Sequence, residues 1–280
     1  MKILNWNCDG GFFRKGRYKS ILEYDADIMI IQECSDPDKS TEVEKLYPNY
    51  CWLPDYKPEE VLIKGRTVQD EGVAVFSKDG ISLKGLLWEI ECDEEITWWK
   101  VDKRTATPEQ KTGTPIIKNR RLRGFNPVEI KCFELLLLGV HTKTSITPNK
   151  YNGIGQMLPY LKNIVSELSN YKNVIIAGDL NAGFKEGDKE KYKELIDEYD
   201  KNYNLKDSVQ NYTDVFIPTH YESSGIGYID DFIFLSKHLN IKIIPPSKWK
   251  INTKGKKKWG YVGDNNKGSD HCPLILEIEI

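Results

Sequence analysis

Short apolar runs of strand length recur along the chain, and many of them end in polar residues. The run from Val174 to Ala177 is continuously apolar, which indicates a strand buried on both faces, and it ends at Gly178. Asp179 and Asn181 follow two positions apart, so an extended chain places their side chains on the same side. Gly, Asp and Asn are also the usual turn residues, so a turn explains this stretch equally well when it is taken alone.

The N-terminal segment has the pattern of a strand, a helix and a second strand. Ile3 to Cys8 is predicted to be a strand that carries Asn7 near its end. Apolar residues then recur at helical spacing within Arg14 to Tyr24, and Asp27 to Ile31 is an apolar run that leads to Glu33. This order predicts an α/β unit with Asn7 and Glu33 at the same sheet edge.

The rest of the chain is predicted to be rich in strands. Nine stretches have strand patterns: 50–53, 72–77, 81–90, 96–101, 127–133, 135–141, 228–235, 241–244 and 273–280. Two longer stretches are predicted to be helices, 149–168 with one apolar face and 186–200 with a charged, solvated surface. Residues 246–268 are predicted to be a polar, lysine-rich loop.

Composition narrows the class of protein. The 280 residues carry a net charge of −2, so no global basic field indicates a nucleic-acid partner and any such signal has to be local. The N-terminus lacks the apolar core of a secretory signal, and no apolar run approaches the ~18 residues of a membrane span. Six widely spaced cysteines without a Cys-x-x-Cys pair favour reduced thiols.

No stretch of the sequence has the character of a linker between domains. We therefore expect one cytoplasmic domain over residues 1–280 without a membrane partner.

Polar residues recur at the ends of the predicted strands: Asn7, Glu33, His141, Asp179, Asn181, Asp230, Asp270 and His271. Such a series at successive strand ends is typical of an active site at one edge of a sheet. Carboxylate and amide oxygens suit Mg²⁺ or Mn²⁺, whereas the few histidines without nearby cysteines do not indicate zinc. A hard divalent ion together with histidines and carboxylates is the equipment for hydrolysing a phosphoester.

Six short motifs carry a resemblance to a known family: Trp6-Asn7, Gln32-Glu33, Gly139-Val140-His141, Gly178-Asp179-Leu180-Asn181, Tyr228-Ile229-Asp230-Asp231-Phe232 and Ser269-Asp270-His271. In this order they resemble the endonuclease/exonuclease/phosphatase superfamily, which includes pancreatic-type deoxyribonucleases and exonuclease III-type repair nucleases. They span nearly the whole chain. The resemblance implies a four-layer α/β/β/α sandwich, in which two mixed β-sheets pack face to face with helices outside.

The resemblance also implies roles for these residues. Glu33 is expected to be the main Mg²⁺ ligand, assisted by Asn7 and Asp270 directly or through water. Asp179 is expected to position or deprotonate the attacking water, and Asn181 to hold the scissile phosphate.

The histidines complete the implied site. His271, oriented by Asp230, is expected to contact the phosphate or to act as a base, and family members are interpreted both ways. His141 is expected to stabilise the leaving group as an acid, with Glu71 as its orienting partner.

Several of these residues also have a purely structural interpretation. Asn7 fits a turn, Glu33 fits a helix N-cap, His141 fits a core histidine, and residues 230–231 fit a solvated strand face. The joint order of the motifs favours the functional interpretation. Two further histidines are interpreted as surface or packing residues: His220 and His238.

Two features of the sequence bear on the substrate. Inositol polyphosphate phosphatases and pancreatic-type nucleases typically place an Arg directly after the Asp that pairs with the catalytic His. With Asp230 as the pairing residue, Asp231 stands here in place of that Arg, which weakens the case for an inositol polyphosphate substrate. Two basic stretches favour nucleic acid, since lysine and arginine contact phosphates and aromatic rings stack on bases. Their candidate contact residues are Lys254, Lys256, Lys257, Lys258, Trp259, Arg120, Arg121 and Arg123. A solvated loop is the structural alternative for these charges.

The sequence therefore predicts a Mg²⁺- or Mn²⁺-dependent nuclease that acts on DNA or RNA, with DNA favoured, and leaves 5′-phosphate and 3′-hydroxyl ends. The alternative is a phosphatase or phosphodiesterase of a small phosphorylated molecule, such as an inositol phosphate, a nucleotide or a lipid headgroup. A third interpretation is a nucleic-acid-binding protein that has kept the fold without catalysis.

Overall fold

The computed structural model describes residues 1–10, 12–13, 16–37, 41–55, 71–86, 88, 96–98, 117–119, 124–142, 161–162, 164–208, 218–221, 226–244 and 269–280. None of the described helices has the length and apolar composition needed to cross a membrane.

The first sheet contains six strands within the described residues, in the order β14-β15-β1-β2-β4-β3. β1 and β2 are parallel and their neighbours are antiparallel. The strands are β1 (Lys2–Asn7), β2 (Ile28–Cys34), β3 (Asn49–Pro54), β4 (Gly72–Ser77), β14 (Asn240–Ile244) and β15 (Leu274–Glu279).

The second sheet has the order β11-β13-β10-β9-β8-β5 in the described part of the chain, with β12 paired to β13. β9 and β10 are its parallel pair, so both sheets have one parallel pair flanked on each side by antiparallel pairings. The strands are β5 (Lys84–Gly85), β8 (Gly124–Ile130), β9 (Leu135–His141), β10 (Asn173–Phe184), β11 (Leu205–Asp207), β12 (His220–Tyr221) and β13 (Gly227–Ser236). A separate ladder joins β6 (Ile96–Trp98) and β7 (Ile117–Asn119).

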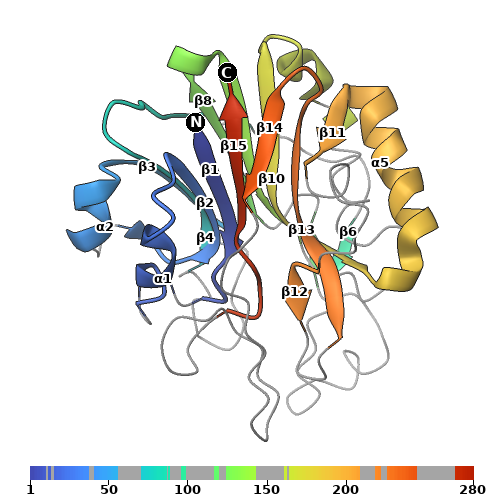
Figure 1. Cartoon of the computed structure of the whole chain (residues 1–280), viewed down its shortest axis with the longest axis horizontal. Helices are drawn as coiled ribbons and strands as arrows, with labels where there is room; N and C mark the ends of the chain where they lie inside the picture. Colours follow the sequence, from blue (N-terminus) through green and yellow to red (C-terminus); the bar gives the residue numbers. More distant parts are fainter. Residues whose placement is uncertain are drawn as a thin grey trace, which may run out of the picture.

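Helices cover the outer faces of the two sheets (Figure 1). α1 (Lys19–Leu22) and α2 (Thr41–Leu46) lie on the first sheet, and α5 (Lys189–Tyr203) lies on the second. Residues 161–162 and 164–168 are also helical, and 3₁₀ turns occupy Lys131–Phe133 and Glu186–Asp188. The predicted four-layer α/β/β/α sandwich is confirmed.

Strand alternation sorts apolar side chains into three cores. On β1, Ile3 enters the core between the sheets and Leu4 enters the core under α1 and α2. On β13, Ile233 lies between the sheets whereas Phe232 and Phe234 pack on the α5 side. Because side chains alternate with a period of two, the inward-facing row of each strand can be followed to its end.

Several predicted boundaries are wrong. The strand predicted over 174–177 continues as β10 to Phe184. Of the strand predicted over 81–90, the described residues contain only Lys84–Gly85, a short edge strand. The strand predicted over 127–133 begins earlier, and its last residues form the 3₁₀ turn. The 246–268 loop lies outside the described residues, and so do the first part of the 149–168 helix, the last residues of the 96–101 strand and part of the 81–90 strand.

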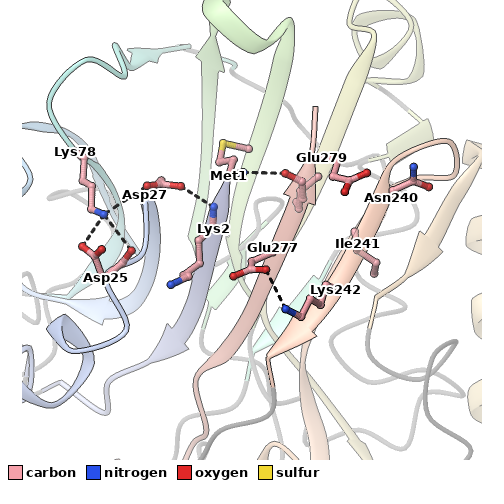
Figure 2. A pocket seen from close by; sticks show the side chains of 11 residues that line it. Met1, Lys2, Asp25, Asp27, Lys78, Asn240, Ile241, Lys242, Glu277 and Glu279 are labelled. Carbon is pink, nitrogen blue, oxygen red and sulfur yellow. Dashed lines mark hydrogen bonds and ion pairs between the residues drawn. The ribbon is translucent and has the colours of Figure 1, made fainter.

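A pocket of about 450 Å³ lies where β1 and β14 begin and β15 ends (Figure 2). Its charged groups compensate one another. Lys78 pairs with Asp25 at 2.6 Å, and Lys242 pairs with Glu277 at 3.6 Å. Asn7 is at the other end of β1, so this pocket is remote from the predicted site.

Candidate active site

Polar residues end the inward-facing rows of four strands and meet at one end of the sandwich. On β9, His141 follows Leu135 and Leu137, and in the sheet register it is paired with Asp179 on β10. On the other side of β10, Asp179 is paired with Asp231 of β13. Asp179 therefore lies between His141 and Asp231 in the second sheet.

Asp179 is the centre of this cluster, and it is 1 % exposed. Its Oδ2 accepts a hydrogen bond from Asn7 Nδ2 at 2.8 Å, across from the first sheet. The same oxygen lies 3.7 Å from His141 Nε2 and 3.9 Å from His271 Nε2. Its Oδ1 accepts the backbone N–H of Asn181 at 2.8 Å. Both carboxylate oxygens are thus fixed by N–H donors.

Glu33 reaches the cluster through an irregular backbone. It has φ +53°, and the β2–β4 register shifts between Ile31 and Cys34. Positive φ is uncommon for residues other than glycine, and bulges redirect side chains near active sites. Glu33 Oε1 lies 3.6 Å from His141 Nε2.

Asn181 is placed by a second irregularity, on β10. Its φ is +44°, and the β10–β13 register shifts between Asp179 and Phe184. The side-chain Nδ2 donates to the carbonyl of Thr142 at 2.8 Å, which fixes the amide beside Asp179.

Gly178 is required where β10 passes β9 next to the cluster. A Cβ at this position would lie 1.7 Å from the carbonyl oxygen of Val140, a backbone atom that cannot move aside without shifting the strand. The glycine of the Gly-Asp-Leu-Asn motif therefore permits the close approach of the two parallel strands.

The carboxylate that orients His141 is Asp55, which corrects the prediction of Glu71. His141 Nδ1 lies 3.1 Å from Asp55 Oδ2, and both side chains are buried. Asp55 follows β3, and the β3–β4 pairing brings it beside Glu71, whose carbonyl accepts the Asp55 N–H at 3.0 Å. The Glu71 carboxylate instead lies beside Gly10, 2.6 Å from where a Cβ on that residue would be.

The carboxylate that orients His271 is Asp231, which corrects the prediction of Asp230. His271 Nδ1 lies 2.8 Å from Asp231 Oδ2. The reason is strand alternation, because Asp231 shares the inward face of β13 with Ile233. Asp230 points the other way, where its Oδ1 accepts the Gly183 N–H at 2.5 Å. The residue after the pairing aspartate is consequently Phe232, which is buried.

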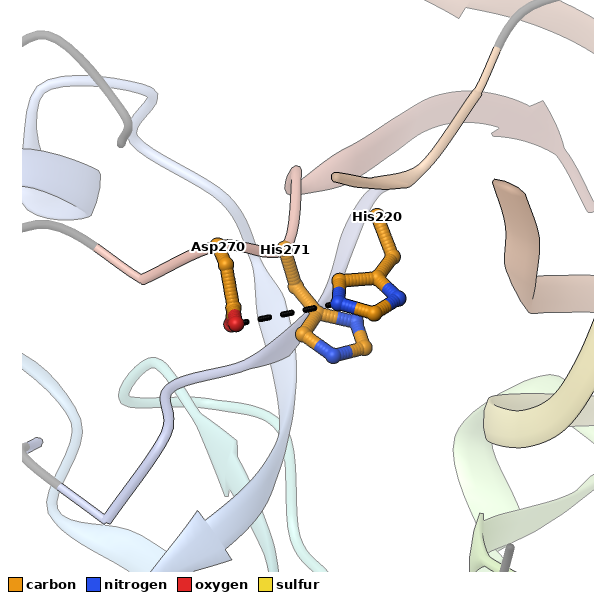
Figure 3. A group of neighbouring side chains, drawn as sticks. All are labelled: His220, Asp270 and His271. Carbon is orange, nitrogen blue, oxygen red and sulfur yellow. Dashed lines mark ion pairs between the residues drawn. The ribbon is translucent and has the colours of Figure 1, made fainter. Parts of the chain in front are cut away.

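His220, interpreted from the sequence as a surface or packing residue, belongs to the site (Figure 3). Its Nδ1 lies 2.7 Å from Asp230 Oδ2, and its Nε2 lies 3.7 Å from Asp270 Oδ2. Its ring stacks on that of His271, with centroids 4.4 Å apart and planes 9° from parallel. His238, by contrast, contacts Asn173 at the far end of the sheet.

Burial and charge shift several pKa values in the cluster. Burial raises the pKa of Asp179, although the nearby His271 and His141 oppose this. Burial alone would lower the pKa of His271, but the carboxylates of Asp231 and Asp179 outweigh it and raise that pKa well above its usual range. Burial would raise the pKa of Asp270, but the nearby imidazoles of His220, 3.7 Å away, and of His271 lower it.

A sequence model of the endonuclease/exonuclease/phosphatase family matches residues 4–271. The chain belongs to this family. Its members are hydrolases of phosphoesters that depend on divalent metal ions. No curated protein matches the chain in sequence.

Solved structures in this family share the fold over essentially the whole chain. The human Nocturnin catalytic domain with bound sulfate is 16 % identical, with TM-score 0.57 and coverage of 100 % of this chain and 94 % of that one. The Xenopus laevis APE2 catalytic domain is 17 % identical, with TM-score 0.56 and coverage of 99 % and 91 %. The 3′ phosphatase NExo from Neisseria, bound to a product DNA hairpin, is 14 % identical, with TM-score 0.54 and coverage of 100 % of both chains. At these identities the likeness establishes the fold alone.

The donor set fits the divalent ion of an endonuclease/exonuclease/phosphatase family enzyme. Within the described residues, Asp231 Oδ1 is buried without a hydrogen-bond partner, while the other oxygen of that carboxylate pairs with His271, so one acceptor atom of the cluster is left for a bound group. Asp179, Asp231 and His271 each have a ligand atom within 4.8 Å of the others, and so do His220, Asp270 and His271. Glu33 is in neither trio, although its carboxylate contacts the same cluster at His141 Nε2, 3.6 Å away.

The residues predicted to contact nucleic acid lie outside the described residues: Lys254, Lys256, Lys257, Lys258, Trp259, Arg120, Arg121 and Arg123. Ile244 is the last described residue before the lysine-rich segment, and Ser269 is the first described residue after it. Ser269 is fixed to the cluster, since its hydroxyl donates to the Asn7 carbonyl at 2.7 Å.

Proposed function

We propose that this chain is a divalent-metal-dependent phosphodiesterase, and specifically a nuclease that hydrolyses DNA and leaves 5′-phosphate and 3′-hydroxyl ends. The observation that carries the proposal is the convergence on Asp179 of Asn7 from the first sheet and of His141 and His271 from the second sheet and the segment before β15. A buried carboxylate between two imidazoles is suited to proton transfer at a phosphate.

Asp179 is the proposed base. Its Oδ2 is aimed by the Asn7 amide, and burial raises its pKa, which strengthens the carboxylate as a proton acceptor for water. Asn181 is the proposed phosphate contact. One N–H of its amide is committed to Thr142, and the second N–H of the same nitrogen is the donor offered to a phosphate oxygen.

His271 and His141 have separate proposed roles. His271, held by Asp231, favours the imidazolium form and is proposed to stabilise negative charge on the phosphate oxygens. His141, held by Asp55 through Nδ1, directs Nε2 into the cluster and is proposed to protonate the leaving 3′ oxygen. Water then adds to phosphorus, its proton goes to Asp179, and the P–O3′ bond breaks with proton donation from His141.

Glu33, Asp270 and the side-chain carbonyl of Asn7 are the proposed ligands of the divalent ion, taken to be Mg²⁺ or Mn²⁺. Asn7 Oδ1 accepts the Asp9 N–H at 2.9 Å and keeps a second lone pair for this purpose. When bound, the ion supplies positive charge against the phosphate in the transition state.

The choice of DNA rests on the sequence around the site. The lysines and aromatic residues between 248 and 267 lead directly into Ser269, so the end of this segment is tied to the cluster. NExo, a protein of the same fold, is bound to a DNA hairpin in its solved structure. The buried Phe232 after Asp231, in place of an Arg, weakens the case for an inositol polyphosphate.

The direct test incubates the purified protein with Mg²⁺ or Mn²⁺ and a panel of supercoiled plasmid, linear duplex, single-stranded DNA and RNA. Inositol phosphates and nucleotides form the second arm. We expect metal-dependent cleavage of DNA that chelation abolishes. Survival of every nucleic acid alongside hydrolysis of a small phosphoester would favour the alternative, a phosphatase or phosphodiesterase of a small phosphorylated molecule. Binding of DNA without turnover would favour the non-catalytic binding protein.

A second test addresses the basic loop. Replacing Lys256, Lys257 and Lys258 with alanine should weaken DNA binding and flatten its salt dependence, by about one unit of log–log slope for each phosphate that the protein no longer neutralises. An unchanged slope would identify the loop as solvated surface. A single-domain organisation and a cytoplasmic location remain predictions from the sequence.

A further inference from the structure

The segment that carries His220 is fixed by its backbone between two parts of the site. His220 is paired with Tyr228 of β13 and forms a β-bridge with His271. The hydroxyl of Thr219, just before it, accepts the N–H groups of both Asp230 and Asp231, at 3.0 and 2.9 Å. The backbone at His220 is therefore held against the part of β13 that carries the two aspartates.

The His220 side chain makes three contacts with the site. Asp230 holds Nδ1 at 2.7 Å, the ring lies flat on that of His271, and Nε2 lies 3.7 Å from Asp270 Oδ2 (Figure 3). The structure thus contains two parallel carboxylate–imidazole pairs, Asp230 with His220 and Asp231 with His271.

The stacking excludes a single ion shared by both imidazoles. A metal ion lies in the plane of each ring that binds it, because the nitrogen lone pair lies in that plane. The planes of His220 and His271 are 9° from parallel and the centroids 4.4 Å apart, so no point near both rings lies in both planes. His220 therefore acts on its neighbours and is not a second imidazole ligand of an ion bound by His271.

Among the neighbours of His220, Asp270 has the side chain with the most conformational freedom. Its side chain is 48 % exposed, whereas that of Asp179 is 2 % exposed. An exposed carboxylate retains rotamer freedom that is given up when it binds an ion, and a fixed ion-pair partner reduces this entropic cost.

We propose that His220 is a positioning residue, which holds the Asp270 carboxylate through Nε2 and braces the His271 ring by stacking. The inference rests on the proposed function, in which Asp270 binds the divalent ion and His271 contacts the phosphate.

The test measures Mn²⁺ binding to the metal-free protein by calorimetry, without substrate. His220→Phe keeps a ring for stacking but removes the Nε2 donor, and His220→Asn keeps a donor near Asp230 but cannot reach Asp270. Both should weaken Mn²⁺ binding about 10- to 100-fold, the range typical when a residue that supports a metal ligand is removed. His220→Gln, whose amide reaches Asp270, should restore affinity to within about threefold. His238→Phe is the matched control and should bind Mn²⁺ as wild type does.

Circular dichroism of each variant shows that the fold is kept. Mn²⁺ binding by the Phe and Asn variants within twofold of wild type would overturn the inference, and so would a Gln variant as weak as Phe or a wild type that binds no Mn²⁺. Because no substrate is present, a protein that binds Mn²⁺ with this pattern but cleaves no phosphoester would refute the proposed function and leave the inference standing.

Discussion

Exchanging the amide and the carboxylate between positions 7 and 179 separates the contribution of their hydrogen bond to stability from the contribution of the Asp179 carboxylate to catalysis. The starting variant is Asp179→Asn, which removes a charge without changing the shape of the side chain. In the native chain both oxygens of Asp179 accept N–H groups, from Asn7 Nδ2 and from the Asn181 backbone, each at 2.8 Å.

The magnitude follows from counting donors. An asparagine at position 179 offers one oxygen and one NH₂, so whichever way the amide is turned, one of the two N–H donors faces another donor. A buried donor without an acceptor costs about 1–3 kcal/mol. The double variant Asn7→Asp, Asp179→Asn restores the count. Its new carboxylate at position 7 accepts from the new amide at position 179, while the other carboxylate oxygen still accepts the Asp9 N–H. Most of the stability should therefore return.

Stability is measured by urea unfolding in EDTA, and activity by cleavage of a labelled DNA duplex with Mn²⁺. Asp179→Asn should lower kcat by ~100- to ~10,000-fold, and the double variant should stay inactive, since the base has moved. Asp197→Asn, on the exposed side of α5, is the control and should change unfolding by less than about 0.5 kcal/mol. A double variant no more stable than the single one would refute the hydrogen-bond reasoning, and an active Asp179→Asn protein would refute the assignment of the base.

Three further predictions concern the backbone, the histidine pairs and pH. Gly178→Ala should destabilise the fold by more than about 3 kcal/mol in urea unfolding, because a Cβ would lie 1.7 Å from a backbone oxygen of β9. A Cβ at Gly187 would meet open space, so Gly187→Ala is the control and should be near neutral, and equal effects of the two substitutions would contradict this. Asp231→Asn should reduce kcat at least tenfold more than Asp230→Asn in steady-state assays, because Asp231 pairs with His271 and Asp230 pairs with His220. The reverse order would favour Asp230 as the functional partner of His271. Burial alone lowers the pKa of His220, but two carboxylates outweigh it and raise that pKa from 6.5 to about 9. The ion pair therefore stabilises the metal-free fold below about pH 6.5, and this contribution is lost as pH rises through about 9. Thermal melts should show a steeper decline over this range in wild type than in His220→Phe, which keeps the contribution of His271, and equal declines would contradict this.

Strand alternation accounts for most of what the sequence predicted. Ile175 and Ala177 enter the core between the sheets, and the same inward row places Asp179 at its end. The strand ends were therefore predictable from local pattern, whereas the four layers were implied by the family resemblance. The same rule identifies Asp231 as the inward residue of β13, since it is in phase with Ile233 and Leu235. Choosing Asp230 overlooked a signal that the sequence contained.

Other parts of the site had no local signal. Asp55 pairs with His141 across 86 residues of sequence, and it lies beyond the end of β3 rather than in a motif. His220 is in a strand of two residues, too short for periodicity to reveal. Glu33 should face away from the cluster by alternation, and only the bulge in β2 and its positive φ turn it inward.

The most direct test of the central claim maps the ends produced from one labelled DNA duplex, by wild type and by Asp179→Asn, with and without Mn²⁺. We predict metal-dependent products with 5′-phosphate and 3′-hydroxyl ends from wild type and none from the variant. Equal cleavage by the two proteins, or products that end in 3′-phosphate, would contradict a site in which Asp179 activates water and His141 protonates the leaving 3′ oxygen.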